Sequence, residues 1–274
     1  MTDLIVRKLL IDLDTSFPLR WNDQDAFTSA FMNALSMSFP VGEQFFIDSL
    51  RRGVKELAPE VQAQFAADVK GFIGQEATHR RIHERFNQHV LSQGMVNHWE
   101  RRALRRIEKI NQKKAIHAVA ITAAYEHYTS VFADWLLHHP EFLAQAPERL
   151  RTLWMWHASE ETEHRCVSFD IYRAMNGNET WRKRWMLMVT VFFLSDILRQ
   201  TCNNLWHDGS LFKLTTWRSA WRHLFAKQGL FTSSFATWKN YFRPDFHPGD
   251  HDDQLSRQWL QTHPTSYQPV GQAL

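Results

Sequence analysis

Apolar residues recur every three or four positions along most of this 274-residue chain, and this repeat constrains the fold more than any other feature. Side chains three and four positions apart share one face of an α-helix, whereas a strand needs alternation of period two, which is nearly absent. Glycine and proline, which interrupt helices, number only 10 and 9. We therefore predict an all-α protein.

Prolines and small polar residues divide this repeat into separate helices. Ser38, Phe39 and Pro40 have the pattern of a helix start, because serine caps helix N-termini and proline fits the first turn. We expect helices over residues 25–37, 38–57, 59–92, 97–138 or 111–138, 147–175, 180–205, 211–227 and 231–242.

The composition divides the chain into three parts. Residues 25–177 mix both signs of charge and should form a four-helix bundle. Residues 178–243 hold ten Lys/Arg, three Asp/Glu and fourteen aromatic residues, so we expect a basic aromatic helical extension packed on the bundle. Residues 244–274 hold four Asp and one Arg without a helical repeat, and we expect an acidic, loop-like tail.

The overall composition excludes several classes of protein. A net charge of +3 gives no general attraction for nucleic acid, and two cysteines cannot form a disulfide framework. The longest apolar run, Trp185 to Leu194, is about half of the ~20 residues in a membrane-spanning helix, and the N-terminus lacks a signal-peptide pattern. We expect a cytoplasmic protein that binds no nucleic acid.

Two Glu-x-x-His motifs carry the strongest chemical signal. One pairs Glu76 with His79 and the other pairs Glu161 with His164. Residues three apart share a helix face, so each motif presents one carboxylate and one imidazole to a common point. A solvated helix face is the alternative explanation for each motif.

Each motif has a partner glutamate on the preceding helix. Glu43 precedes Glu76 by 33 residues, and Glu126 precedes Glu161 by 35. The two members of each pair lie about equally far from the turn between their helices, so at ~1.5 Å per residue they meet at one height of an antiparallel hairpin. The sequence therefore predicts two similar hairpins whose carboxylates and histidines converge.

This set of residues is typical of the dimetal-carboxylate site of ferritin-like four-helix bundles. Four carboxylates balance the charge of two divalent cations, whereas buried carboxylates without cations would each cost several kcal/mol or be protonated. We therefore expect a ferritin-like bundle that binds two iron ions, with manganese or zinc as alternatives. Glu76 and Glu161 should bridge the ions, with Glu43 and Glu126 as terminal carboxylates.

His157 extends the second motif, because it lies four residues before Glu161 on the same helix face. We predict it as a third nitrogen ligand beside His79 and His164; a core histidine bonded to a backbone carbonyl would fit the same pattern. Weaker candidates, expected to surround the ligands, are His83, Arg80, Arg165 and Glu160.

The chain resembles two families on these residues. The stripe of His157, Glu161 and His164 is similar to that of the di-iron arylamine N-oxygenases, which carry an additional protein ligand. From about residue 36 to 243 the chain resembles the bacterial family called predicted metal-dependent hydrolases. The motifs that carry this second resemblance are Ser38-Phe-Pro-Val-Gly-Glu43, Gln75-Glu-x-x-His79-x-x-x-His83, Glu126-x-Tyr128, Trp156-His-Ala-x-Glu-Glu-x-Glu-His164 and Phe242-Arg-Pro-Asp-Phe-His-Pro248.

The function that we expect first is a non-haem dimetal oxidoreductase. It would activate O2 with an external electron donor and would oxidise or oxygenate a small organic or lipid-like substrate. The same site could instead activate a water molecule as a metal-dependent hydrolase. A non-catalytic protein, for iron storage or as a membrane-associated helical scaffold, is the third alternative.

The basic aromatic segment, residues 181–242, leaves two alternatives open. Its aromatic side chains either pack against the bundle or lie with neighbouring Lys and Arg in the headgroup layer of an anionic membrane. The second alternative predicts peripheral attachment at the inner face of the membrane and a lipid-like substrate.

Overall fold

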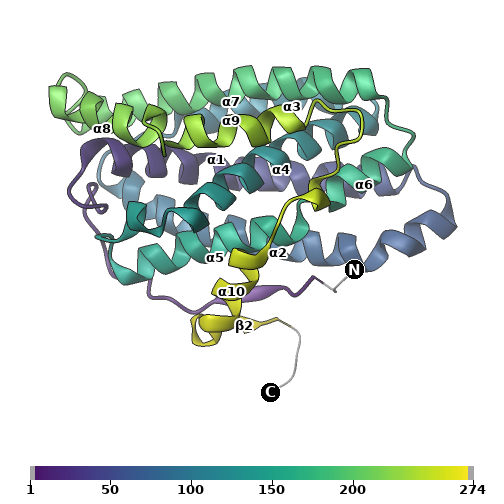
Figure 1. Ribbon diagram of the computed structural model, residues 1–274, viewed down its shortest axis with the longest axis horizontal. Coiled ribbons are helices and arrows are strands. Elements are labelled where there is room, and N and C mark those ends of the chain that lie inside the picture. Colours follow the sequence, from purple (N-terminus) through teal and green to yellow (C-terminus); the bar gives the residue numbers. More distant parts are fainter. Residues whose placement is uncertain (1–3, 271–274) are drawn as a thin grey trace.

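Helices form most of the molecule (Figure 1), as the apolar repeat predicts. The computed structural model describes residues 4–270. The helices are α1 Ala26–Val54, α2 Pro59–Ser92, α3 His98–Asn111, α4 Ala115–His138, α5 Glu148–His164, α6 Val167–Ala174, α7 Glu179–His207, α8 Leu214–Phe225, α9 Leu230–Asn240 and α10 Gln254–Thr262. Short 3-10 turns cover Pro140–Leu143, Pro248–Asp250 and Pro264–Ser266, and a two-stranded sheet joins β1 Arg7–Leu9 to β2 Tyr267–Pro269. The all-α prediction is confirmed.

Four helices form the central bundle. Helix α1 packs on α2 and α4, and α5 packs on both α2 and α4, so the four helices enclose one core. Fully buried apolar side chains fill that core, among them Leu50, Phe72, Leu150 and Leu153. Helix α2 ends before Gly94, whose φ of +92° is readily adopted only by glycine. The bundle places long helices side by side, which allows side chains far apart in sequence to meet.

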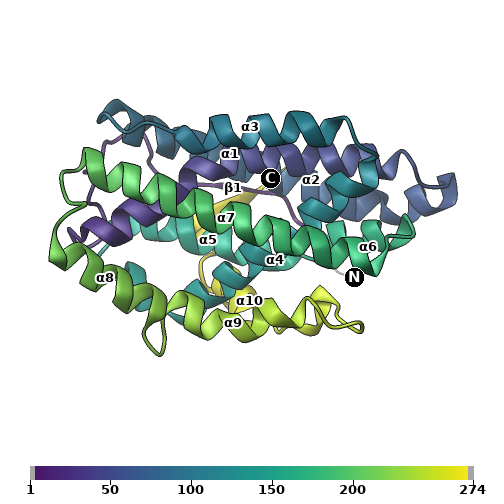
Figure 2. The same ribbon diagram turned by 90° about the horizontal axis from the view of Figure 1, so that it is seen from above.

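The remaining helices cover two sides of the bundle. Helix α7 lies across α1 and α4, with α3 along one side of it and α8 and α9 along the other (Figure 2). The basic aromatic segment therefore forms α7, α8 and α9, which contact α1 and α4. Among the described helices, α7 is long and apolar enough to span a membrane by length and composition, and 44% of its most apolar window is buried inside the protein.

The predicted helix start at Ser38 is wrong, because α1 continues through Pro40. Proline lacks the N–H that would bond to the carbonyl oxygen of Ser36. The side chain of Asn87 on α2 donates to that oxygen instead, at 2.9 Å. The carbonyl therefore stays paired, and the helix does not have to end.

Two of the expected long helices are divided. The two alternative starts for the third predicted helix, residues 97 and 111, mark two helices, since Asn97 caps α3 and α4 begins at Ala115. The helix expected over residues 147–175 is interrupted between α5 and α6. Arg165 and Cys166 keep α-helical backbone angles there, so the interruption is short.

The loop prediction for residues 244–274 is wrong for the described part of that segment. Helix α10 packs on α5, where the Ser256 hydroxyl donates to the carbonyl oxygen of Ser159 at 2.7 Å. Strand β2 then pairs antiparallel with β1. Contacts with the bundle and with β1 stabilise the helix and the strand in this polar segment. Because the segment has no apolar repeat of its own, its sequence does not predict them. Residues 271–274 lie outside the described residues.

Candidate metal centre

Seven ionisable side chains meet in the middle of the four-helix core. Each is at most 4% exposed, and they come from α1, α2, α4 and α5. They are Glu43, Glu76, His79, Glu126, His157, Glu161 and His164, the residues that the motifs predict as ligands. The four helices thus direct their polar side chains inward at the same height of the bundle, as expected for two similar hairpins.

One half of the centre forms around His164. Its Nε2 lies 3.1 Å from Oε1 of Glu76 and 3.3 Å from Oε2 of Glu126. The same nitrogen lies 3.7 Å from Oε2 of Glu161. This half therefore offers one imidazole and three carboxylates.

The other half forms around two histidines. The Nε2 atom of His157 lies 2.8 Å from Oε1 of Glu161 and 3.8 Å from Oε1 of Glu43. The Nδ1 atom of His79 lies 3.7 Å from the same oxygen of Glu161. Glu161 thus contacts residues of both halves, and Glu76 also has a carboxylate oxygen close to each half. Glu43 lies close to the ligand atoms of His79 and His157.

The unpaired polar atoms of this cluster fit a pair of metal ions. Both carboxylate oxygens of Glu43, Glu76 and Glu126 are buried without a hydrogen-bond partner. Nδ1 of His79 and Nε2 of His164 are unpaired as well. Buried polar atoms are normally paired, and buried carboxylates without a partner are costly. Carboxylate oxygens and imidazole nitrogens are donors that divalent transition metals prefer, so the donor set fits two such ions.

The electrostatics of the carboxylates leads to the same conclusion. Burial, reinforced by neighbouring carboxylates, raises the pKa of Glu43 and Glu76 well above the ordinary value. Burial raises the pKa of Glu126 to about 7, although the nearby His164 opposes the shift. Cations at this point would offset both causes, because an opposite charge favours the ionised carboxylate.

A chain of hydrogen bonds fixes the orientation of His157. The hydroxyl of Ser36 donates to Oδ1 of Asn87 at 2.7 Å, so Ser36 must accept a proton from Nδ1 of His83, 2.8 Å away. His83 then accepts at Nε2 from Nδ1 of His157, over 2.7 Å. Nδ1 of His157 is therefore occupied by this chain of hydrogen bonds, and Nε2, which donates to Oε1 of Glu161 at 2.8 Å, is the nitrogen that faces the cluster and that a metal ion would bind in place of the proton.

Gln75 orients His164 in the same way. The amide nitrogen of Gln75 donates to the carbonyl oxygen of Ile5 at 3.0 Å and to Glu163 at 2.8 Å. Its amide oxygen is thus left to accept from Nδ1 of His164, 2.9 Å away. Nε2 of His164 is the nitrogen that remains for a metal.

His79 is oriented from outside by an ion-paired carboxylate. Its Nε2 donates to Oε2 of Glu160 at 2.9 Å, while Arg7 on β1 donates to Oε1 of Glu160, also at 2.9 Å. Arg7 also binds Glu163, at 2.7 and 3.0 Å. Burial raises the pKa of Glu160 to about 8, and Arg7 acts in the opposite direction.

The weaker candidates divide into two pairs. His83 and Glu160 contact ligand histidines directly. Arg80 and Arg165 bind groups outside the cluster: Arg80 binds Gln44 and the carboxylate of Glu84, and Arg165 binds the backbone oxygen of His251. Each arginine follows a ligand histidine by one residue, and one residue on a helix turns a side chain by about 100°, away from the site.

The sequence argument assigned no role to three residues around the centre: Arg7, Gln75 and Glu163. Gln75 had a detectable signal, because it lies four residues before His79 and eight before His83, on one helix face. Arg7 had none, since it reaches the site from a three-residue strand that precedes the bundle. Glu163 looked like part of a solvated face.

The fold and the site define a class of protein: an all-α bundle whose core carries a carboxylate–histidine cluster suited to two metal ions. Residues 5–252 match the family described as predicted metal-dependent hydrolases, so the chain belongs to that family. The resemblance based on the five motifs is confirmed. No curated protein and no solved structure gives a significant match.

The family corrects the predicted chemistry. The expected oxidoreductase function is wrong, because the family is one of hydrolases, which was the alternative. The physical reason is that glutamate and histidine bind redox-active and redox-inert ions alike. The spacing of His157, Glu161 and His164 therefore predicts metal binding but does not distinguish oxidation from hydrolysis.

Proposed function

We propose that the protein hydrolyses its substrate with a water molecule activated between two divalent metal ions in the bundle core. The observation that supports this most is the set of unpaired, buried carboxylate and imidazole atoms directed into one space. Membership of a hydrolase family supports it independently. Two bound ions about 3.5–4 Å apart would supply an activated water and polarise the bond to be cleaved.

The ligand roles follow from the geometry of the cluster. In our proposal Glu76 and Glu161 would be shared by the two ions, since both have ligand atoms near both halves. Glu126 and His164 would complete one half, and Glu43, His79 and His157 the other. The outer partners of the histidines, Glu160, His83 and Gln75, hold the orientations of the rings, which favours metal binding.

A small cavity leads to this centre from the side of α1 and α4. Its volume is about 70 Å³, and its walls include His157, Glu161 and the aromatic ring of Phe39. Apolar side chains make up most of the remaining wall, so bulk water is excluded. His157 and Glu161 lie on this wall close to the centre, so a substrate group in the small cavity would reach the metal ligands directly.

Metal analysis tests the proposal. We expect about two divalent ions per chain, zinc, manganese or iron, in protein purified without added metal, and loss of both ions in the double variant Glu76→Ala/Glu161→Ala. Esterase activity should disappear with chelation and return with the metal found. Protein that neither contains nor can be loaded with metal would refute the proposal.

We also propose a location that remains to be tested. The protein would lie in the cytoplasm, with residues 181–242 against the anionic inner face of the membrane. The support is the exposure of large apolar side chains in this segment, including Trp206, Phe212 and Trp221, among basic residues.

A further inference from the structure

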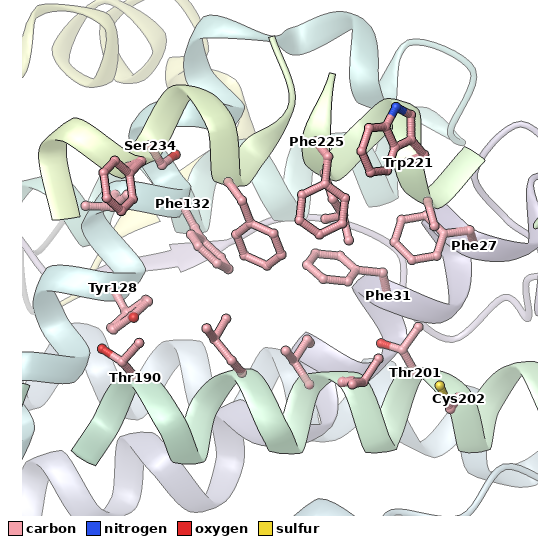
Figure 3. A pocket seen from close by; sticks show the side chains of 18 of the residues that line it. Phe27, Phe31, Tyr128, Phe132, Thr190, Thr201, Cys202, Trp221, Phe225 and Ser234 are labelled. Atoms are coloured by element: carbon pink, nitrogen blue, oxygen red, sulfur yellow. The ribbon is translucent and has the colours of Figure 1, made fainter. Parts of the chain in front are cut away.

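A large apolar cavity lies between the bundle and the outer helices. Its volume is about 590 Å³, within the range of roughly 300–1,000 Å³ that is typical of small-molecule sites. Side chains from α1, α4, α7, α8 and α9 line it, and Figure 3 shows the rings of Phe31, Phe132, Phe225 and Trp221 facing the residues of α7 across the open space. Protein cores pack without voids of this size, so packing alone does not account for the cavity.

The lining selects a ligand whose enclosed part carries no charge. Among the described residues that line it there is no Asp, Glu, Lys, Arg or His, and its polar groups are hydroxyls, the thiol of Cys202 and the indole N–H groups of three tryptophans. The hydroxyl of Thr190 is already bonded, since it donates to the backbone oxygen of Met186 and accepts from Trp238. Whatever fills the cavity is therefore held by apolar contact.

The cavity is long as well as apolar. Its residues on α7 run from Thr190 to Leu205 along one helix face, a span of roughly 22 Å at ~1.5 Å per residue. An acyl chain of a membrane lipid reaches about half of the ~30 Å hydrocarbon core of a bilayer. The cavity is long enough to hold such a chain extended, whereas a compact ring system would leave much of its length empty.

The cavity adjoins the small cavity beside the metal centre and opens to solvent. The small cavity beside His157 and Glu161 shares three wall residues with the large one, Phe31, Tyr128 and Phe132. The two spaces are therefore neighbours separated by side chains rather than by backbone. On the outer side, Trp221 and Phe225 on the wall are 66% and 48% exposed, so the cavity opens to the surface between α8 and α9.

We propose that this cavity binds a long aliphatic acyl chain and presents its carbonyl group, through the small cavity, to the dimetal centre. The inference rests on the proposed hydrolase function and adds the substrate class to it. The reaction is a hydrolysis: the oxygen of a water molecule bonds to the acyl carbon, the bond from that carbon to the leaving oxygen or sulfur breaks, and the leaving group takes up a proton. The products are a fatty acid and an alcohol or thiol, with no oxidant or reductant.

Binding of cis-parinaric acid, a fluorescent long-chain fatty acid, to the metal-free protein tests the cavity without relying on activity. We expect saturable binding to the wild type. Leu194→Trp, which adds a large ring to the cavity wall on α7, should weaken binding about tenfold or more. The matched control is Leu187→Trp, the same exchange two turns earlier on α7, at an exposed leucine that lies outside the cavity wall. It should bind as the wild type does.

A series of p-nitrophenyl esters separates this inference from the proposed function. In the metal-loaded protein kcat/KM should rise from the acetate to the palmitate ester, and Leu194→Trp should reduce it about tenfold more for palmitate than for acetate. Hydrolysis without dependence on chain length, together with unsaturable probe binding, would overturn the acyl-chain inference and leave the hydrolase standing. Saturable probe binding without hydrolysis of any ester would overturn the hydrolase while supporting the cavity assignment.

The source of the acyl chain needs two further substrates. Phosphatidylglycerol vesicles offer the chain in a membrane lipid, and an acyl thioester offers it in solution. Release of free fatty acid from either supports the inference and identifies the source. Release from neither, by protein that cleaves only short soluble esters, would contradict it.

Discussion

At the scale of single residues, the centre depends on what lies behind the ligands. Every histidine that faces the cluster has its outer nitrogen bonded: His79 to Glu160, His157 to His83, and His164 to Gln75. These contacts decide which ring nitrogen carries a proton, and thus which one has a lone pair for metal.

Glu160 offers a direct test of this arrangement. Glu160→Gln keeps the size of the side chain but, at a pH above the raised pKa of about 8, removes the charge that holds the proton of His79 on Nε2. We expect metal affinity to fall about 10- to 100-fold at the half that contains His79, with the other half nearly unchanged. Competition titration with a chromophoric chelator measures both sites. Glu84→Gln, which replaces a half-exposed partner of Arg80, is the control. An equal loss at both halves would contradict the assignment.

Glu126 makes the stability of the metal-free protein depend on pH. Burial raises its pKa to about 7 from an ordinary 4.5, so the folded state retains a proton that the unfolded chain has released. Its contribution to stability is complete below pH 4.5 and is lost as the pH rises through about 7. In EDTA, Glu126→Gln should therefore raise Tm at about pH 8 and change it little at about pH 5. Scanning fluorimetry checks this, with the exposed Glu56→Gln as control; a Tm difference independent of pH would refute it.

The sequence predicted the seven side chains of the cluster because they obey helix periodicity. Glu76 and His79 share a face, and the residue counts to each turn set the height at which hairpin partners meet. Arg7 was unpredictable for the same reason: its contact with Glu160 crosses 153 positions of the chain and no periodicity links them. Local spacing reports local geometry, and contacts across the fold are decided by packing.

At the scale of elements, helix α1 shows how a tertiary contact overrides a local signal. The sequence around Pro40 indicates a helix end, yet Asn87 from α2 satisfies the carbonyl of Ser36 that proline leaves unpaired. The amide oxygen of the same asparagine accepts a hydrogen bond from the Ser36 hydroxyl, which is itself bonded to His83. The side chain of Asn87 therefore contributes both to the packing of α1 on α2 and to the orientation of His157. The helix α10 and strand β2 likewise depend on contacts with α5 and β1.

A double-mutant cycle tests this explanation of α1. Asn87→Ala leaves the buried Ser36 carbonyl unpaired, and we expect a loss of about 1–3 kcal/mol in the free energy of unfolding. Pro40→Ala restores a backbone N–H to the same carbonyl. In that background the cost of Asn87→Ala should be smaller by about 1 kcal/mol, as measured by urea denaturation. Strictly additive effects would show that the asparagine does not compensate for the proline.

At the scale of the whole molecule, most of the exposed large apolar side chains belong to the outer helices α7, α8 and α9 and the turns between them. Phe212 is 85% exposed, Trp221 66% and Trp206 61%, on α7, α8 and the turn between them. Trp221 also lines the mouth of the acyl-chain cavity. Large exposed aromatic side chains beside basic residues favour the headgroup layer of an anionic membrane. A protein seated there would open its cavity toward the phase in which long acyl chains are found.

Vesicle flotation tests this orientation. We expect the wild type to float with vesicles rich in phosphatidylglycerol and to stay at the bottom with neutral vesicles, with binding weakened by salt because the attraction includes Lys and Arg. The pair Trp206→Glu/Phe212→Glu should abolish flotation while leaving the parinaric acid affinity unchanged, since neither side chain lines the cavity. Leu104→Glu, at a 51% exposed leucine on α3, is the matched control. If the wild type stays at the bottom with anionic vesicles, the exposed face has another role, and the cavity must draw its acyl chain from solution.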